Sequence, residues 1–214
     1  MTNTATEYYQ QSRPEMIAFL PPHPRRLIDI GCAEGRFGEA VKALHPNCET
    51  WGIEAVAEAA AKAAIRNDRV IQASLEEVND LPENYFDVVT MNDVLEHMLK
   101  PRLALATARR ILKPDGLLIL SLPNVQFILN VLNLVIRNDW EYQDSGILDR
   151  THVRFYTAKS AVRMLEENDF SVQSVTGINP TRPKFRYRVL FKLAPSIFKW
   201  MPFFQFAIVA RPAS

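Results

Sequence analysis

Short apolar runs alternate with segments of helical periodicity along the first half of the chain. A continuous apolar run predicts a strand buried on both faces, and apolar residues three and four positions apart predict an amphipathic helix. The predicted strands are Leu27–Ile30, Thr50–Ile53, Arg69–Gln72, Phe86–Met91 and Leu117–Ser121. The predicted helices are Gly35–Leu44, Ala55–Arg66 and Pro101–Leu112, and a KPDG turn is predicted at 113–116. Strands that alternate with helices indicate a parallel sheet with right-handed crossovers.

The pattern becomes less regular after residue 122. Residues 124–136 have helical periodicity, 137–157 form an irregular stretch rich in aromatic and polar residues, and Thr157 is a candidate N-cap for a helix over Thr157–Asn168. Two late apolar runs predict strands at Phe170–Thr176 and Phe204–Arg211. Because no linker-like segment divides the chain, we interpret residues 1–214 as a single domain.

The composition is that of an ordinary globular domain. The 214 residues are 48% hydrophobic and 23% charged, and a net charge of +1 gives no reason to expect nucleic acid as a partner. Cys32 and Cys48 are too few for a disulfide framework or a thiolate metal site, so we expect reduced cysteines and a cytoplasmic protein. The sequence lacks the basic start and apolar run of a signal peptide, and no stretch reaches the ~20 apolar residues of a membrane span.

A loop of small residues follows the first predicted strand. A dinucleotide-binding loop spaces its glycines as G-x-G-x-x-G, but Arg36 occupies the position of the third glycine. The spacing present is G-x-A-x-G, formed by Gly31, Ala33 and Gly35. Small residues let the backbone approach a cofactor closely or adopt positive φ. Gly38 leaves a dinucleotide interpretation open in another register, so this loop alone does not identify the cofactor.

A carboxylate stands at the end of the second predicted strand. Glu54 can accept charge-assisted hydrogen bonds from both hydroxyls of a ribose. Dinucleotide-binding folds use the same arrangement, so Glu54 indicates a nucleotide cofactor without selecting one class of protein.

The segment 86–124 distinguishes dinucleotide-binding proteins from a second class of nucleotide-cofactor proteins. Its sequence, FDVVTMNDVLEHMLKPRLALATARRILKPDGLLILSLPN, closely resembles the corresponding part of class I S-adenosylmethionine-dependent methyltransferases. The small-residue loop resembles the first motif of that family, with Ala33 in place of a central glycine, and Asp115 stands where the family often has glycine. Within the family, the chain is similar to the bacterial small-molecule group that includes ubiquinone-type O-methyltransferases and cell-surface glycan methyltransferases.

The resemblance implies a Rossmann-like α/β fold. Its sheet would have seven mostly parallel strands, with the last strand antiparallel and helices on both faces. Residues 1–25 would form a helical cover, 26–124 the cofactor-binding core and 125–214 the acceptor side. The implied cofactor is S-adenosyl-L-methionine, and the implied product is S-adenosyl-L-homocysteine.

The resemblance also implies a set of cofactor-binding residues. Asp29 would orient the loop and contact the methionine amine, unless it only caps the edge of the sheet. Ser74 and Leu75 would lie at the adenine. Asn92 and Asp93 would lie at the methionine end, unless Asp93 is only the N-cap of a following helix. The cysteine of the loop would contribute its backbone alone. The complete set is Asp29, Gly31, Cys32, Ala33, Gly35, Glu54, Ala55, Ser74, Leu75, Asn92 and Asp93.

Two histidines are candidates for the general base of a transfer to a hydroxyl group. Histidine suits this role near neutral pH, and His152 is the first candidate and His97 the second. Glu96 and His97 are adjacent, but two ligands without a third at useful spacing do not make a metal site, so we predict no metal. A buried structural histidine is the alternative interpretation of His97.

The stretch DRTHVRFYT, residues 149–157, is the main candidate for acceptor binding. If it is extended, positions 150, 152 and 154 share one face, which would present Arg150, His152 and Arg154 to an anionic acceptor. The alternative is a solvated loop in which Arg154 pairs with a glutamate at 166 or 167.

Two further segments have open interpretations. Trp140 and Tyr142 would form a wall for an apolar or sugar-like acceptor, or would simply cover the core. The insert 183–202 alternates basic with aromatic residues, and it would either make peripheral membrane contact or pack on the sheet as a lid. Arg13, before the first strand, is assigned no contact.

The sequence therefore predicts an enzyme that transfers a methyl group to a small-molecule acceptor. The expected acceptor group is a hydroxyl on a metabolite, a quinone-like compound or a glycan-type compound. A NAD-dependent Rossmann oxidoreductase and a non-catalytic cofactor-binding partner subunit are the alternatives.

Overall fold

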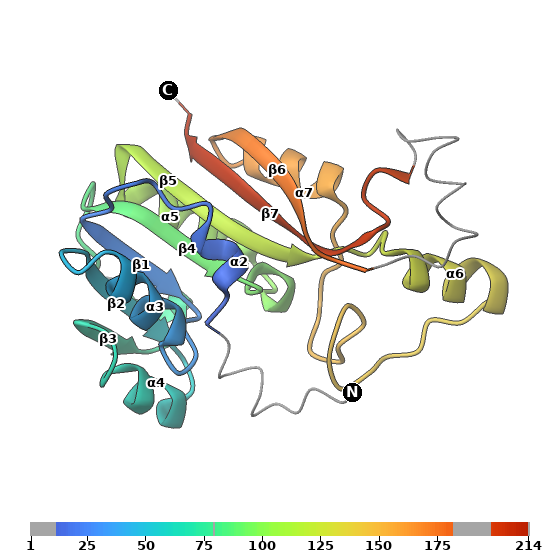
Figure 1. Cartoon of the computed structure of the whole chain (residues 1–214), viewed down its shortest axis with the longest axis horizontal. Helices are drawn as coiled ribbons and strands as arrows, with labels where there is room; N and C mark the ends of the chain where they lie inside the picture. The colour runs from blue at the N-terminus through green and yellow to red at the C-terminus, as the bar shows by residue number, and fades with distance from the viewer. Residues whose placement is uncertain (1–11, 79, 182–197, 214) are drawn as a thin grey trace.

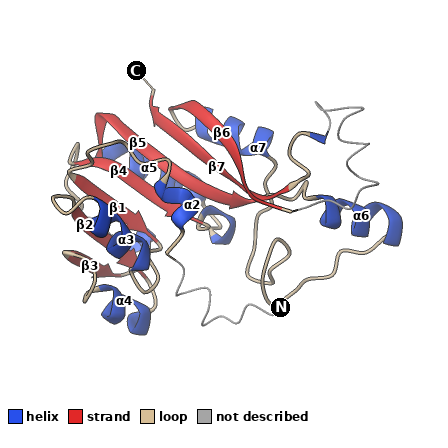
Figure 2. Cartoon of the chain, viewed as in Figure 1, coloured by secondary structure: helices blue, strands red, loops and turns tan. Residues whose placement is uncertain are grey.

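A seven-stranded sheet forms the centre of the computed structural model, which describes residues 12–78, 80–181 and 198–213 (Figure 1). The strands lie in the order β3-β2-β1-β4-β5-β7-β6, with helices on both sides of the sheet (Figure 2). Their bounds are Arg26–Ile30 for β1, Glu49–Glu54 for β2, Arg69–Gln72 for β3, Phe86–Asn92 for β4, Leu112–Pro123 for β5, Phe170–Pro180 for β6 and Phe203–Pro212 for β7.

The strand directions agree with the prediction. β1 to β5 pair in parallel, whereas β7 lies antiparallel between β5 and β6. The predicted Rossmann-like sheet, mostly parallel with an antiparallel last strand, is therefore confirmed. Because the first five strands run in the same direction, the loops that follow β1, β2 and β4 meet at one edge of the sheet, the carboxyl edge.

Helices pack on both faces of the sheet and enclose two separate cores. Leu105 of α5 and Ala161 of α7 pack in the cluster that contains Ile28 of β1. Phe37 of α3 packs in the other cluster with Leu27, the neighbouring residue of β1 that points to the opposite face. The α-helices are α2 (Pro14–Ile17), α3 (Arg36–Leu44), α4 (Ala57–Ala63), α5 (Pro101–Ile111), α6 (Ile128–Arg137) and α7 (Ala158–Glu166), and the 3-10 helices are η1 (Leu75–Glu77) and η2 (Leu95–His97).

A third apolar cluster lies around α6, which Figure 1 shows beyond the end of the sheet. The rings of Phe127 and Phe204 meet edge to face with centroids 5.4 Å apart, and those of Trp140 and Phe155 do so at 5.2 Å. The buried members of this acceptor-side cluster are Phe127, Ile128, Ile147 and Leu148. It does not share residues with the two cores of the sheet.

The KPDG sequence at 113–116 is the first part of β5, so the prediction of a separate turn is wrong. Phe86 pairs with Leu112 and Val88 pairs with Leu117, so residues 113–116 bulge opposite a single residue of β4. That residue is Asp87, which forms an ion pair with Lys113. This pair holds the bulge against β4, and the strand therefore continues through it.

The helix predicted at 124–136 begins later than expected, because α6 starts at Ile128. The Asn124 side-chain amide donates to the carbonyls of Trp200 and Phe203, at 2.8 and 2.9 Å, and fixes the first residues of this segment in a non-helical turn. By contrast, the N-cap predicted at Thr157 is confirmed at the start of α7.

The expected N-terminal helical cover is only partly formed in the described residues 12–25. α2 is one helical turn, with Pro14 at its start. Prolines at 21, 22 and 24 lack the N–H groups that a longer helix would need. Residues 1–11 lie outside the described part of the chain.

The insert predicted at 183–202 also lies mostly outside the described residues, because 182–197 are not described. The proposed membrane contact of this insert therefore stays a prediction. None of the helices in the described ranges has the length and apolar character needed to cross a membrane.

Candidate active site

A cavity of about 1220 Å³ opens at the carboxyl edge of the sheet. One side is formed by the ends of β1 and β2 and by η1, and the other by η2, the start of α6 and the loop 143–152. The volume exceeds the range of about 300–1000 Å³ that is typical of a site for one small ligand. The cavity is therefore large enough for two small molecules that react with each other.

The predicted cofactor residues divide into two groups. One group lines the cavity and consists of Gly31, Ala33, Glu54, Ala55, Ser74, Leu75 and Asp93. The other group is not part of the lining and consists of Asp29, Cys32, Gly35 and Asn92.

The small-residue loop has the backbone conformation that its spacing predicts. Gly31, Ala33 and Gly35 have φ values of 72°, 49° and 78°, all in the left-handed region. A Cβ atom on Gly31 would lie 2.7 Å from a methyl carbon of Val94, so this residue must be glycine for the loop to pack against η2. Burial raises the pKa of the Cys32 thiol well above its usual range, so this thiol is unreactive at neutral pH.

Glu54 is buried at the end of β2 and fixes the loop. One carboxylate oxygen accepts the backbone N–H of Ala33 at 2.9 Å, and the other accepts that of Val56 at 2.9 Å. Each oxygen retains a second lone pair, and the residue lines the cavity. Glu54 is thus positioned both to hold the loop and to accept hydrogen bonds from a ligand.

Asp29 is a buried acid beneath the loop. It accepts a hydrogen bond of 2.6 Å from the hydroxyl of Thr90, its partner residue on β4, and a longer one of 3.4 Å from the Asn92 amide. Burial raises the pKa of Asp29 to about 7, and the hydrogen bond from Thr90 only partly opposes this effect. The side-chain oxygen of Asn92, Oδ1, has no hydrogen-bond partner within the described residues.

Ser74 and Leu75 lie where η1 begins. Ser74 is the N-cap of η1, and its backbone N–H donates to the Glu77 carboxylate at 3.2 Å. Both residues line the cavity next to Glu54. The short helix therefore places a hydroxyl and an apolar side chain at the far side of the cavity from η2.

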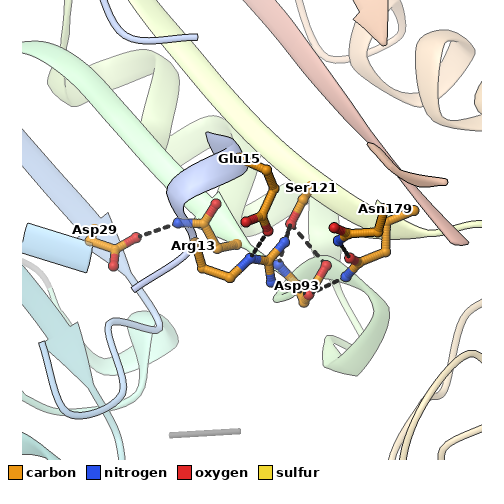
Figure 3. A network of polar contacts seen from close by, with 8 residues as sticks. Arg13, Glu15, Asp29, Asp93, Ser121 and Asn179 are labelled. Atoms are coloured by element: carbon orange, nitrogen blue, oxygen red, sulfur yellow. Dashed lines mark hydrogen bonds and ion pairs between the residues drawn. The ribbon is translucent and has the colours of Figure 1, made fainter. Parts of the chain in front are cut away.

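Asp93 is the centre of a buried polar network that the sequence did not predict (Figure 3). It forms an ion pair with Arg13, and its carboxylate also accepts from the Ser121 hydroxyl at 2.8 Å and from the Gln205 amide at 2.5 Å. Arg13 donates in addition to Ser121 at 2.9 Å. The network joins the N-terminal segment to β4, β5 and β7, over sequence separations that no local pattern reveals.

The N-cap interpretation of Asp93 is wrong. Its φ of 55° is left-handed, and η2 begins only at Leu95, without a side-chain cap. Burial opposes the charge of Arg13, but Asp93 and Glu15 together raise its pKa above the ordinary value. Arg13 therefore stays protonated inside the protein.

Glu96, His97 and His152 meet on the other side of the cavity. The two imidazole rings pack edge to face with centroids 4.7 Å apart, although 55 positions separate them in the chain. Burial, reinforced by Asp93, raises the pKa of the Glu96 carboxyl well above its usual range. Partial burial and the neighbouring His152 lower the pKa of His97.

The other predicted acceptor residues lie away from the cavity lining. The shared face expected for positions 150, 152 and 154 is wrong, because the backbone N–H of His152 closes a turn onto the Asp149 carbonyl. His152 is buried, whereas Arg150 is exposed and pairs with Asp144 at 2.9 Å.

Arg154 donates to two backbone carbonyls, those of Met98 and Leu99, and not to a glutamate of α7. Glu167 pairs instead with Arg102, at 3.1 Å. Trp140 packs on Phe155 in the acceptor-side cluster, and Tyr142 is exposed. Neither aromatic residue lines the cavity.

Comparison with protein families gives a match over most of the chain. The family model described as "Methyltransferase domain" matches residues 3–175. The mitochondrial ubiquinone biosynthesis O-methyltransferase of Schizosaccharomyces pombe is 26% identical over 169 residues, which cover 75% of this chain and 61% of that protein. The ubiquinone biosynthesis O-methyltransferase of Haemophilus ducreyi is 33% identical over 110 residues, covering 47% of this chain and 46% of that protein.

Solved structures share the fold. A SAM-dependent methyltransferase from Archaeoglobus fulgidus superposes with a TM-score of 0.70 at 18% identity, over 95% of this chain and 92% of that one. One from Mesorhizobium loti gives a TM-score of 0.63 at 18% identity, over 92% and 96% of the two chains. Among the first curated relatives, the chain spans between 30% and 61% of their own lengths.

We expect the Arg13–Asp93 pair to be a main contributor to stability. Replacing Arg13 with alanine removes the guanidinium from a buried carboxylate, which should lower the free energy of unfolding by about 3–5 kcal/mol. The R13A/D93N double variant should regain on the order of 2 kcal/mol of that loss, because the buried charge is gone. Urea denaturation measures both values, with E15A as a control expected to change the free energy by less than about 1 kcal/mol. Equal stability of R13A and the double variant would contradict this assignment.

Asp29 should make stability fall as the pH rises toward neutrality. Its pKa is about 7 in the folded protein, against an ordinary value of 3.8, so the folded state holds the proton more tightly. The contribution of Asp29 to the free energy of unfolding is therefore fully present below about pH 4 and is lost as the pH rises to about 7. Relative to D29N, the wild type should lose on the order of 2 kcal/mol between pH 5 and pH 8 in urea denaturation. A constant difference between the two proteins over this range would show that Asp29 does not titrate as described.

Proposed function

The chain belongs to the methyltransferase domain family, and from that membership we propose that it transfers a methyl group from S-adenosylmethionine to a hydroxyl of a small molecule. The observation that supports this proposal is one continuous cavity, which is lined by seven of the predicted cofactor residues and, on its other side, by two histidines. The ubiquinone biosynthesis O-methyltransferases among its relatives support an oxygen acceptor, and a quinone-like aromatic hydroxyl is the first acceptor class to test.

The residues at the carboxyl edge fit the proposed cofactor. Glu54 would accept the ribose hydroxyls through its remaining lone pairs, and Ser74 and Leu75 would contact the adenine. The glycine at position 31 keeps the loop free of a side chain where the cofactor would approach. Asp93 lines the cavity at the end where the methionine part would lie, and the adjacent side-chain oxygen of Asn92, which has no partner in the described residues, is a candidate acceptor for the methionine amine.

The histidines would assist the acceptor. The cofactor, when bound, supplies a methyl group on a positively charged sulfur, which is electrophilic without further activation. What the chain must add is orientation, exclusion of water and a path for the hydroxyl proton; positioning alone is worth about 7–11 kcal/mol in favourable cases. His152 is the first candidate for accepting that proton and His97 the second, because both line the acceptor side of the cavity.

We also propose that the protein is cytoplasmic. Its support is that Cys32 and Cys48 are both free and buried, as expected for a protein folded under reducing conditions.

One prediction of the proposed function concerns the cofactor. Isothermal titration calorimetry should give micromolar binding of S-adenosylhomocysteine and no binding of NAD, because Arg36 stands where a dinucleotide loop needs its third glycine. The E54A variant should bind at least about tenfold more weakly, equivalent to about 1.4 kcal/mol. The control is E58A, whose side chain is 82% exposed on α4. Binding of NAD would favour the oxidoreductase, and binding of neither would favour the non-catalytic partner subunit.

Another prediction of the proposed function concerns the histidines. In an acceptor screen with radiolabelled cofactor, H152A and H97A should each lower turnover on a hydroxyl acceptor, and the double variant by about 10²–10⁴-fold. Binding of S-adenosylhomocysteine should be unchanged in the same variants, because neither histidine is on the cofactor side. Full activity of both single variants on the true acceptor would exclude a histidine-assisted O-methylation.

A further inference from the structure

The cavity wall contains acidic side chains and, among the described residues, no lysine or arginine. The arginines expected at an anionic acceptor are engaged elsewhere, Arg150 with Asp144 and Arg154 with backbone carbonyls. A phosphate or carboxylate on the acceptor would therefore lie beside carboxyl groups without a cationic partner, which disfavours an anionic acceptor. The acids of the wall are Glu54, Glu76, Asp93, Glu96, Asp144 and Asp149.

Asn130 presents a hydrogen-bond acceptor to the cavity from α6. The side chain is 7% exposed and lines the cavity, and its Nδ2 donates to the Val125 carbonyl at 2.7 Å. A carbonyl can only accept, so this contact determines which end of the amide is the nitrogen. No described residue donates to Asn130 Oδ1. The amide oxygen is thus left to accept from a ligand.

Asn179 presents a second acceptor from the end of β6 (Figure 3). Its Nδ2 donates to Gln205 Oε1 at 2.6 Å, and Gln205 Nε2 donates in turn to the Asp93 carboxylate at 2.5 Å. The same carboxylate oxygen accepts from Arg13, so it is an acceptor, and Gln205 must present its nitrogen to Asp93 and its oxygen to Asn179. Asn179 Oδ1 is left without a donor among the described residues.

Asp149 is a third acceptor and lies on the loop 143–152 that lines the cavity. The N–H and the hydroxyl of Thr151 both donate to Oδ1, at 2.8 and 2.6 Å, and no described residue donates to Oδ2. Burial opposes the charge of Asp149, but the bonds from Thr151 and the nearby His152 and His97 lower its pKa below the ordinary value. Asp149 therefore offers carboxylate lone pairs at neutral pH.

The same cavity has an apolar wall. Phe127 and Phe204 line it, and their rings meet edge to face with centroids 5.4 Å apart. A sugar ring has C–H groups that can pack on such a wall and hydroxyls around its edge, whereas a catechol carries only two hydroxyls. Acceptors on three different elements call for several donors on one ligand, because a polar group left unpaired on binding costs free energy.

We propose that the methyl acceptor is an uncharged, polyhydroxylated sugar or sugar-like ring whose hydroxyls donate to Asn130, Asn179 and Asp149. The inference rests on the proposed methyl transfer and narrows its acceptor to one class. The oxygen of a further hydroxyl forms the bond to the methyl carbon, and the carbon–sulfur bond breaks with its electron pair on sulfur. The O–H proton passes to a histidine of the cavity and then to solvent. The two asparagines and Asp149 thus determine which molecule is methylated.

An acceptor panel with radiolabelled S-adenosylmethionine and the full chain tests the proposal. The probes are methyl glycosides of neutral hexoses, their monodeoxy forms, the phosphorylated and uronate forms of the same sugars, and catechol. We expect transfer to at least one neutral glycoside and none to the phosphorylated or uronate forms. A monodeoxy form that lacks a bound hydroxyl should have a kcat/KM lower by about tenfold or more, because the site is left with an unpaired acceptor.

Variants of the two asparagines test the named contacts. N130A and N179A should each raise the KM for the glycoside by about tenfold with a smaller effect on kcat, because the lost bonds hold the acceptor before and during transfer. The monodeoxy glycoside that lacks the hydroxyl bound by one asparagine should lose nothing further in that variant.

Two matched controls should behave as the wild type does. N168A removes an amide that also donates to a backbone carbonyl at 2.7 Å, and N138A replaces a residue whose φ of 54° matches the 52° of Asn179. Neither control residue lines the cavity. All four variants should bind S-adenosylhomocysteine as the wild type does in calorimetry, which shows that they are folded.

The outcomes separate this proposal from the proposed function. Faster transfer to catechol than to any glycoside, equal transfer to neutral and anionic sugars, or equal KM values for the wild type, N130A and N179A would overturn the acceptor class. Absence of transfer to every glycoside, with S-adenosylhomocysteine bound by the wild type, would overturn it as well and leave the cofactor assignment in place. Failure of the wild type to bind S-adenosylhomocysteine would instead overturn the methyltransferase proposal, on which this one rests.

Discussion

Buried acidic side chains must be accommodated at the carboxyl edge of this sheet, and that constraint organises the rest of the molecule. Besides Glu34 of the loop after β1, which pairs with Lys62, four buried acids lie at this edge, and each has different hydrogen-bond partners. Glu54 accepts two backbone N–H groups, and Asp29 accepts from a hydroxyl and an amide while its burial favours the protonated form. Asp93 forms an ion pair with the guanidinium of Arg13, whereas the side chain of Glu96 has no hydrogen-bond partner in the described residues. An edge built from acidic side chains offers oxygen acceptors to the N–H and O–H groups of a ligand and can face a positively charged group such as a sulfonium or an ammonium.

The Arg13–Asp93 pair shows how this constraint shapes the fold as well as the site. Burying a charge is costly unless a partner is brought to it, and here the partner comes from outside the sheet. The N-terminal segment crosses the carboxyl edge so that its arginine reaches Asp93, just after β4, and Ser121 of β5 (Figure 3). Gln205 of β7 joins the network through Asp93. The short helix that follows then packs Met16 into one of the two main cores. Electrostatics and apolar burial thus place the same segment.

The sequence alone predicted the elements that depend on interactions between residues close together in the chain. Apolar runs such as Phe86–Met91 fix buried strands, small residues at 31, 33 and 35 fix a left-handed loop, and a hydroxyl at Thr157 fixes a helix start. Features that depend on distant partners were missed. Asp93 follows a strand as an N-cap would, but its partners are 28, 80 and 112 positions away. Similarly, His152 meets His97 only because a turn at 149–152 directs its ring inward, which alternation along an extended strand could not reveal.

The acceptor-side cluster around α6 has its own apolar interior, distinct from the two cores that stabilise the sheet. Substitutions there would change the wall of the cavity while leaving the packing of the nucleotide-binding half undisturbed. Several anchors connect the two halves and need to be retained, among them the Asn124 amide and the backbone N–H groups of Val153 and Arg154, which donate to the Glu96 carbonyl. Such an arrangement favours evolutionary divergence of the cavity wall on a constant scaffold, since the residues around α6 can be replaced by drift and selection without passing through unfolded intermediates.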